Sequence, residues 1–227
     1  MQYEYEINEL EKEDSWRMFR IIGELVGGFD ALSDIEPAVS IYGSSRLQEG
    51  DELYHKTEEI ARKLGEMGFS IITGGGPGIM EAANKGATDA HAKSIGLNIK
   101  LPEEQASNRY TTRSLTFNHF FIRKVMLVKY ASAFVIMPGG LGTLDELTEV
   151  LTLMQTYKIK PFPVILYDGH FWQGFLDWLH RECLAKGYIS EGDLKLLRIC
   201  HSPDEVIEAI QLWYHKQQLA GEQAITR

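Results

Sequence analysis

Residues 135–146 combine the features that could do chemistry in this chain of 227 residues. An apolar run ends at Pro138, three glycines follow, and an amphipathic segment begins. This order predicts a strand, a tight loop and a helix N-terminus, whose free N–H groups and partial positive charge suit a phosphate. Thr143 and Glu146 also fit a capping box, in which the hydroxyl and the carboxylate satisfy the first N–H groups of the helix. The pattern alone leaves phosphate binding and capping open.

Two other turns also follow predicted strands. Gly43 precedes two hydroxyl side chains and a cation, Ser44, Ser45 and Arg46, which are suitable contacts for an anion or a ribose. Serines after a strand are equally ordinary turn chemistry. Gly74–Gly78 contains three consecutive glycines, which lose much backbone entropy on ordering. We therefore expect Gly75 and Gly76, within that range, to allow close approach of a ligand or of another backbone.

Arg123 and Lys124 are a second candidate pair. They lie in the first or second turn of a predicted helix over 121–130, where a cation near the positive end of the helix dipole costs about 0.3 to 1 kcal/mol. A bound anion would remove this penalty. A structural ion pair with a carboxylate elsewhere in the fold would remove it too.

The hydrophobic periodicity predicts alternating strands and helices. The predicted strands are 38–42, 69–73, 94–99, 133–137 and 162–167, and 115–120 is a short strand or a helix lead-in. The predicted helices are about 7–32, 51–67, 79–90, 121–130, 144–157, a segment from 169 to about 179, and 203–219.

This alternation predicts one α/β domain over 1–227: a doubly wound, Rossmann-like, mostly parallel sheet with helices on both faces and an N-terminal helical extension over about 1–35. Prolines beside the strand at 162–167 place it toward a sheet edge. Ligands of such sheets bind beyond the carboxyl ends of the strands near a topological switch point. The three turns are therefore expected to converge on one crevice.

Composition excludes several classes of protein. The formal net charge of −9 argues against nucleic acid or an anionic membrane as the main partner. No apolar run approaches the roughly 20 residues of a membrane span, and the first residues lack a signal peptide pattern, so we expect a cytoplasmic protein. Neither G-x-G-x-x-G nor G-x-x-x-x-G-K-[ST] is present. Cys183 and Cys200 have no metal-ligand spacing, and we expect neither a metal nor a cofactor.

The segment Pro138–Glu146 matches, residue for residue, the P-G-G-x-G-T-x-x-E signature of the LONELY GUY (LOG) family. The resemblance extends through Tyr42–Arg46, Gly74–Glu81 and the pair Arg123 and Lys124, and it covers roughly 39–165. Members of this family are cytokinin riboside 5'-monophosphate phosphoribohydrolases, long labelled "lysine decarboxylase". They release a free base and ribose 5-phosphate from a nucleoside 5'-monophosphate.

The resemblance implies a role for each matched residue. Arg123 and Glu146 take the positions of the catalytic residues, and a carboxylate can stabilise an oxocarbenium-like state and orient water. The implied phosphate donors are Gly139, Gly140, Gly142 and Thr143. The resemblance further implies at least a homodimer with the active site near the subunit interface. Residues 101–113 and 120–122 differ from many plant members, which leaves the preferred base open.

Two rival functions have different requirements. A decarboxylase would need pyridoxal phosphate and a Schiff-base lysine, and no lysine here has that sequence context. Molybdenum-cofactor carrier proteins resemble this chain in fold and use glycine-rich turns, but a carrier needs no catalytic carboxylate. Glu146 therefore separates a hydrolase from a non-catalytic carrier.

Overall fold

A computed structural model describes residues 14–101 and 107–225. Its centre is a seven-stranded sheet in which every described pair of neighbouring strands is parallel. The strands are β1 (Ala38–Tyr42), β2 (Ser70–Thr73), β3 (Ser94–Ile99), β4 (Arg113–Phe117), β5 (Ala131–Ile136), β6 (Val164–Tyr167) and β7 (Leu197–Cys200). β1, β2 and β6 are buried along their whole length, which is typical of parallel strands covered on both faces.

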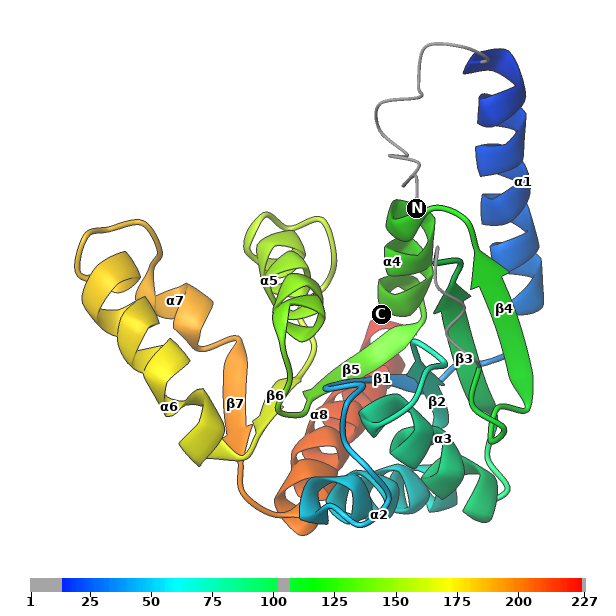
Figure 1. The fold of residues 1–227 in the computed structure, drawn as a ribbon. Coiled ribbons are helices and arrows are strands. Elements are labelled where there is room, and N and C mark those ends of the chain that lie inside the picture. The colour runs from blue at the N-terminus through cyan, green and yellow to red at the C-terminus, as the bar shows by residue number, and fades with distance from the viewer. Residues whose placement is uncertain (1–13, 102–106, 226–227) are drawn as a thin grey trace.

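Helices cover both faces of the sheet (Figure 1). They are α1 (Asp14–Ala31), α2 (Glu52–Glu66), α3 (Ile79–Asp89), α4 (Phe120–Lys129), α5 (Leu141–Gln155), α6 (Gly169–Trp178), the π-helical turn η1 (Leu179–Leu184), α7 (Glu191–Leu194) and α8 (Pro203–Ile225). One apolar core joins the sheet to α2, α3 and α8, and the other joins it to α1, α4, α5 and α6.

The strand order is β4-β3-β2-β1-β5-β6-β7. The chain runs outward from β1 to β4, returns beside β1 as β5, and then continues outward to β7. This is a doubly wound, Rossmann-like topology with its switch point between β1 and β5. The predicted fold class is therefore confirmed, and the first and fifth strands bring their following loops to one end of the sheet.

The edge of the sheet differs from the prediction. β6 was expected toward an edge because of the neighbouring prolines, but it pairs with β5 on one side and with β7 on the other. Pro161 and Pro163 precede Val164, where the strand begins, so neither removes a hydrogen bond from it. β7 is short and includes the exposed Arg198, and its apolar pattern was too brief to predict a strand.

Three further predicted elements compare with the structure in different ways. α1 begins at Asp14, and the earlier part of the predicted helix, 7–13, lies outside the described residues. Of the two alternatives for 115–120, the strand is correct, since β4 ends at Phe117 and α4 begins at Phe120. α5 begins at Leu141, three residues before the predicted start.

Candidate active site

A cavity of about 570 Å³ opens at the carboxyl ends of β1 and β5, at the switch point of the sheet. Its wall comes from the end of β1 and the loop after it, the start of the loop after β2, and the helices α3, α4 and α5. The lining residues are Ile41, Tyr42, Gly43, Ser44, Ser45, Arg46, Gly74, Met80, Arg123, Leu127, Gly140, Leu141, Gly142, Thr143 and Glu146. The volume is within the range of small-molecule sites in proteins.

The backbone of Ser44 ties three elements of this wall together. Its N–H donates to the carbonyl of Pro138 at 3.0 Å, and its carbonyl accepts from the N–H of Ile79, the first residue of α3, at 3.0 Å. Its hydroxyl accepts from the backbone N–H of Arg46 at 3.2 Å. The loop after β1 is therefore held rigidly against the loop after β5.

Arg123 and Glu146 meet on one side of the cavity. Nη2 of Arg123 donates to Oε1 of Glu146 at 3.3 Å, and only 5% of the glutamate is exposed. Arg123 extends from the second turn of α4, with its guanidinium 5.4 Å from the centre of the Phe120 ring. The pair joins two helices, and its two residues are 23 positions apart in the sequence.

Three buried polar atoms of the cavity lack a hydrogen-bond partner within the described part of the chain. They are Nε of Arg123, Oε2 of Glu146 and the hydroxyl oxygen of Tyr42. A buried polar group without a partner costs about 1–3 kcal/mol, so three of them in one cavity require a physical explanation. A polar ligand in the cavity would satisfy them.

Burial raises the pKa of the Glu146 carboxyl to about 7, and the charges of Arg123 and Lys124 oppose that shift. Tyr42 is affected in the same direction, since burial and the neighbouring Glu146 raise the pKa of its hydroxyl far above the usual value. The tyrosine therefore stays a neutral donor at physiological pH. The glutamate can exist in either protonation state near neutral pH, as a general base requires.

The capping-box interpretation of Thr143 and Glu146 is wrong. The N-cap of α5 is Gly140, which has no side chain, so Thr143 lies inside the first turn with its N–H donating to the carbonyl of Gly140 at 3.0 Å. Glu146 lies in the second turn and reaches Arg123, not a backbone N–H of the helix start. Its carboxylate is free to have another role.

The predicted phosphate donors at the start of α5 lie in two different environments. Gly140, Gly142 and Thr143 line the cavity. Gly139 does not, because a Cβ there would lie 2.1 Å from the Thr143 hydroxyl and 3.0 Å from the backbone nitrogen of Ser44. Gly139 thus allows Thr143 and the loop of Ser44 to pack together behind the cavity surface.

The loop after β1 contributes its predicted residues directly. Ser44, Ser45 and Arg46 all line the cavity, and Arg46 and Ser45 are exposed at its mouth. Within residues 14–101 and 107–225, no carboxylate forms an ion pair with Arg46. Its charge is therefore available to an anion entering the site.

Most of the triple-glycine turn after β2 contacts other parts of the protein and not the cavity. Gly74 lines the cavity, but Gly75 and Gly76 do not. Gly75 has a φ of +73°, and its N–H and carbonyl bond to Thr73 and Asn108. The carbonyl of Gly76 accepts from the side chain of Asn108 at 3.0 Å. These two glycines support packing around buried asparagines.

Lys124 also lies outside the cavity lining. Its ammonium group is 3.0 Å from a carboxylate oxygen of Asp145 and 3.1 Å from one of Glu149, both on α5. This is the structural ion pair that the sequence left open as an alternative for the cations of this helix. Together with Arg123 and Glu146, it fastens α4 to α5 beside the cavity.

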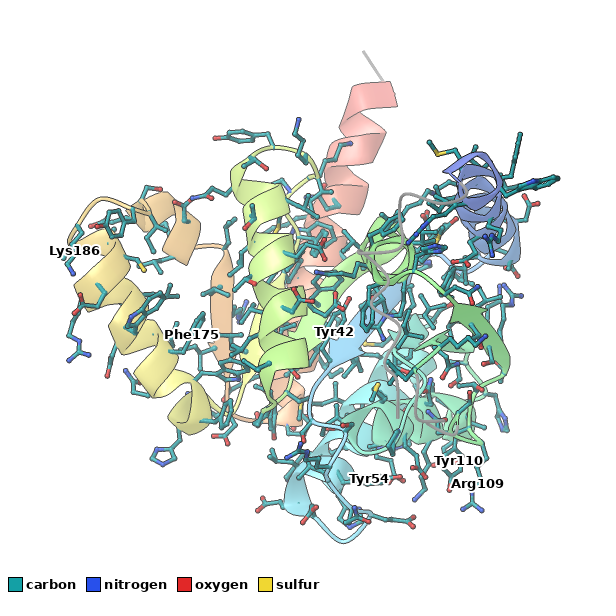
Figure 2. All side chains as sticks on the ribbon, turned by 45° about the horizontal axis from the view of Figure 1, so that its top comes forward. Tyr42, Tyr54, Arg109, Tyr110, Phe175 and Lys186 are labelled. Atoms are coloured by element: carbon teal, nitrogen blue, oxygen red, sulfur yellow. The ribbon has the colours of Figure 1, made fainter. Side chains whose placement is uncertain are left out.

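Five side chains that line the cavity were not predicted as site residues, namely those of Ile41, Tyr42, Met80, Leu127 and Leu141. Tyr42, labelled in Figure 2, ends β1, where the period of two places it on the same face as Ser40. Its ring packs edge-on against that of Phe134, with 5.2 Å between the ring centres. Met80, Leu127 and Leu141 give the cavity an apolar part. Leu141 is 86% exposed, which is unusual for a leucine at a helix start. The available signal for Tyr42, Met80 and Leu141 was their position beside glycine-rich turns, whereas Leu127 lies inside α4 and had no such signal.

Neither a metal cluster nor a membrane helix is found among the residues that the structure describes. No group of three or more His, Cys, Asp or Glu side chains is arranged to hold an ion. No helix in the same ranges is long and apolar enough to cross a bilayer.

The doubly wound sheet with a cavity at its switch point places this chain in the class of α/β proteins whose ligands bind beyond the carboxyl ends of the strands. Residues 80–210 match the family model described as "Possible lysine decarboxylase". The chain belongs to this family, which includes the LOG proteins. The matched residues contain Arg123, Lys124 and the whole start of α5.

Two curated relatives illustrate the similarity. The cytokinin riboside 5'-monophosphate phosphoribohydrolase LOG of Oryza sativa subsp. japonica is 31% identical over 144 residues, which cover 61% of this chain and 58% of that protein. The cytokinin riboside 5'-monophosphate phosphoribohydrolase of Mycobacterium marinum is 27% identical over 163 residues, covering 70% and 85%. The chain thus spans less than two thirds of the rice protein.

Solved structures share the fold. The molybdenum cofactor binding protein of Rippkaea orientalis superimposes with a TM-score of 0.56 at 21% identity, covering 77% of this chain and 93% of that one. The molybdenum cofactor carrier protein of Chlamydomonas reinhardtii gives 0.57 at 18% identity, covering 79% and 98%. Identities this low establish the fold alone.

Proposed function

We propose that the protein hydrolyses the N-glycosidic bond of a nucleoside 5'-monophosphate, giving a free base and ribose 5-phosphate. The observation that carries the proposal is the Arg123–Glu146 pair, in which each partner has one buried polar atom left unpaired in a cavity at the switch point. Such a pair, open to a polar ligand and beside a helix N-terminus, has the groups that this reaction needs.

The phosphate fits the start of α5. The first N–H groups of a helix have no partner within it, and at Leu141 and Gly142 they belong to residues that line the cavity. The dipole of this helix adds partial positive charge, and Arg46 adds a full charge from the opposite loop. These local groups attract an anion although the whole chain is acidic.

The ribosyl group then lies near Glu146. When the bond between C1' and the base breaks, positive charge develops on the sugar, and a carboxylate in a partly buried site stabilises it strongly. The same carboxylate can accept a proton from the water whose oxygen bonds to C1'. The base leaves with the electron pair of the broken bond and takes up a proton from solvent. A pKa of about 7 keeps a large fraction of Glu146 ionised at neutral pH and still basic enough for this role.

The names of the relatives support this reaction. The rice and Mycobacterium marinum proteins are both cytokinin riboside 5'-monophosphate phosphoribohydrolases. At 31% and 27% identity the chemistry transfers more readily than the choice of base. We therefore propose a cytokinin-type or adenine-type nucleotide as substrate and leave the base to experiment.

The test is incubation with AMP and with N6-isopentenyl AMP, followed by chromatography of free base and ribose 5-phosphate. Glu146→Gln keeps the size of the side chain and removes the base, and we expect it to lower kcat by about 10²- to 10⁴-fold. Failure to release base from every nucleoside monophosphate tried would refute the proposal.

Binding measured in parallel distinguishes the rival classes. In a non-catalytic carrier of nucleotide or molybdenum cofactor, Glu146→Gln would leave ligand affinity unchanged and there would be no turnover to lose. A pyridoxal phosphate decarboxylase needs a lysine for the Schiff base, and none of the described residues that line the cavity is a lysine. Absorbance of a Schiff base in the purified protein would reverse that assignment.

A further inference from the structure

The helix α4, which carries Arg123, begins with an unfavourable distribution of charge. Its first turn contains no acidic residue, and the side chain of its N-cap residue, His119, makes no capping hydrogen bond. Arg123 and Lys124 instead add positive charge near the positive end of the helix dipole. The free N–H groups and the partial charge at this helix start therefore need a negative partner from another part of the fold.

Glu24 of α1 supplies that negative partner. Its two carboxylate oxygens accept from the backbone N–H of Asn118 at 3.3 and 3.2 Å, and Oε1 also accepts from the side-chain nitrogen of Asn118 at 2.5 Å. Oε2 lies 3.3 Å from Nδ1 of His119, and the side chains of Glu24 and His119 are only 15% and 10% exposed. Burial alone would raise the pKa of Glu24, but the hydrogen bonds from Asn118 and His119 outweigh burial and lower the pKa. The carboxylate is therefore charged at neutral pH, as the positive end of a helix favours.

A continuous series of contacts leads from Glu24 to the cavity. The carbonyl of His119 accepts from the backbone N–H of Arg123 at 3.2 Å, one turn into α4. The guanidinium of Arg123 in turn donates to Glu146 at 3.3 Å. The residue that contacts Glu24 is thus also the residue to which the backbone of Arg123 is bonded. A shift at the start of α4 would therefore displace the guanidinium from the glutamate.

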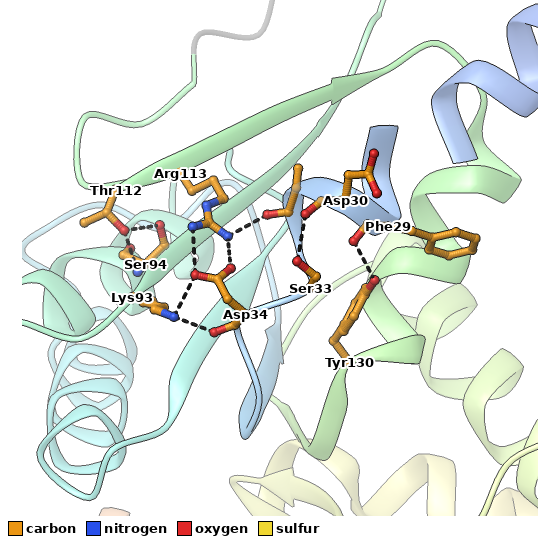
Figure 3. A network of polar contacts seen from close by, with 10 residues as sticks. Phe29, Asp30, Ser33, Asp34, Lys93, Ser94, Thr112, Arg113 and Tyr130 are labelled. Carbon is orange, nitrogen blue, oxygen red and sulfur yellow. Dashed lines mark hydrogen bonds and ion pairs between the residues drawn. The ribbon is translucent and has the colours of Figure 1, made fainter. Parts of the chain in front are cut away.

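The helix α1 also contacts the middle and the end of α4. A Cβ on Gly28 would lie 2.7 Å from the terminal carbon of Met126, so glycine allows the two helices to pack closely there. The hydroxyl of Tyr130, the residue after α4, donates to the carbonyl of Phe29 at 3.2 Å (Figure 3). Contacts at three levels along α4 restrict its sliding and rotation, and Glu24 provides the contact at the helix start.

The helix α1 can hold α4 because α1 is itself fixed to the sheet. Ile21 and Leu25 pack against the core. Just beyond them, Arg113 of β4 donates to the carbonyl of Ala31 and forms an ion pair with Asp34 (Figure 3). The family model matches 80–210, so α1 lies before the matched residues, whereas α4 and α5 lie inside them. An element outside the matched residues thus contacts the helix that carries Arg123.

We propose that Glu24 is a positioning residue for Arg123. By holding the start of α4, it keeps the guanidinium of Arg123 where it meets the carboxylate of Glu146. This inference rests on the proposed hydrolysis for the role of Arg123 in turnover, whereas the position of Arg123 can be tested without turnover. The alternative is that Glu24 only attaches α1 to the domain, in which case its loss lowers stability and leaves the reaction unchanged.

Kinetics of two Glu24 variants with AMP and N6-isopentenyl AMP test the effect on turnover. Glu24→Ala removes the charge and the acceptor oxygens, and we expect kcat to fall by about 10- to 100-fold because the guanidinium is misplaced. KM should change far less, because the groups proposed to bind the phosphate lie on α5 and on the loop after β1. Glu24→Gln keeps an acceptor without the charge, so its kcat should lie between those of Glu24→Ala and the wild type. Asp30→Ala removes an exposed carboxylate from the same helix and is the matched control, with kcat unchanged.

The pH–rate profile separates positioning from a purely structural role. Arg123 opposes the raised pKa of Glu146, so a misplaced guanidinium lets that pKa rise further. The other charged groups that act on the glutamate are Lys124 of α4 and Asp145 and Glu149 of α5. The lysine would move with α4 and shift the pKa in the same direction, while the two acids lie on the same helix as Glu146. In Glu24→Ala the limb of the profile that reports Glu146 should therefore move to higher pH, by up to about 1 unit. A profile and a kcat equal to those of the wild type would overturn the proposal.

Hydrogen exchange of the unliganded protein tests the position of α4 without the reaction. Glu24→Ala should speed exchange of the Arg123 amide and its neighbours in α4 by about tenfold or more, because the start of the helix opens more often. Exchange in α2, on the other face of the sheet, should stay unchanged and would show that the fold is intact. Unchanged exchange in α4 would overturn the proposal. A wild-type chain that releases no base would refute the hydrolysis instead, and the exchange result would still decide whether Glu24 positions α4.

Discussion

Two glycine-rich turns follow strands of the same sheet, and both were predicted to allow the close approach of another group, but their environments are opposite. At the start of α5, a Cβ on Gly140 or Gly142 would meet no atom within 4 Å. In the turn after β2, a Cβ on Gly75 would lie 2.5 Å from the Asn98 side chain, and one on Gly78 would lie 2.5 Å from the carbonyl oxygen of Ser44.

The polar groups around the two turns differ in the same way. Near the turn after β2, the Asn84 side chain bonds to Thr73, Ser94 and Asn108, so the buried amides have partners. Near the start of α5, Arg123 and Glu146 keep unpaired atoms. A glycine-rich turn therefore indicates that another group approaches the backbone closely. Only the surroundings of the turn show whether that group belongs to the protein or to a ligand.

The largest effect on stability should come from a substitution in the turn after β2. Gly78 has a φ of +68°, and a side chain there would be strained and would overlap the backbone of Ser44. We expect Gly78→Ala to lower the free energy of unfolding by about 3 kcal/mol, the sum of backbone strain and overpacking. Denaturant unfolding measures it, and an unchanged midpoint would contradict the packing role of this turn.

Ionisation of Glu146 in the cavity should lower the stability of the folded protein as pH rises. The pKa of Glu146 is about 7 in the folded protein and near 4.5 when unfolded, so the unfolded chain loses that proton first as pH rises. The wild type should therefore lose stability between about pH 4.5 and 7, by roughly 3 kcal/mol at most.

Glu146→Gln cannot ionise and isolates this effect. The stability difference between the variant and the wild type should shift in favour of the variant as pH rises from 5 to 8. Thermal unfolding at both pH values measures the shift. Equal differences at pH 5 and pH 8 would show that burial does not raise the pKa of this carboxyl.

A substitution at the start of α5 should have a smaller effect on stability and should instead affect substrate binding. Gly142→Ala places a methyl group in open space within the first turn of α5, so its stability should stay level or rise by up to about 1 kcal/mol. Because the methyl group would project beside the proposed phosphate site, KM should rise several-fold. Gly174→Ala, in α6 and equally open, is the matched control and should leave KM unchanged.

Much of this fold was predictable because its signals are local. Mostly apolar runs such as 38–42 predicted buried parallel strands, and their alternation with helices predicted a switch point. The Arg123–Glu146 pair followed only from the family resemblance, since the two residues belong to different helices. The partners of Lys124 and the unpaired hydroxyl of Tyr42 depend on how α4 and α5 pack together, which no local pattern contains.

Lys124 gives the smallest predicted effect on substrate binding. Its ammonium group is held by Asp145 and Glu149 and does not line the cavity, so Lys124→Met should change KM by less than about twofold, whereas Arg46→Met should raise it more. The charge of Lys124 also opposes the raised pKa of Glu146, so its loss should move the pH–rate profile toward higher pH. A large rise in KM without that movement would make Lys124 a direct phosphate ligand, which is one of the two alternatives that the sequence left open. A shift of the pH–rate profile with little change in KM would show that Lys124 acts through the pKa of Glu146.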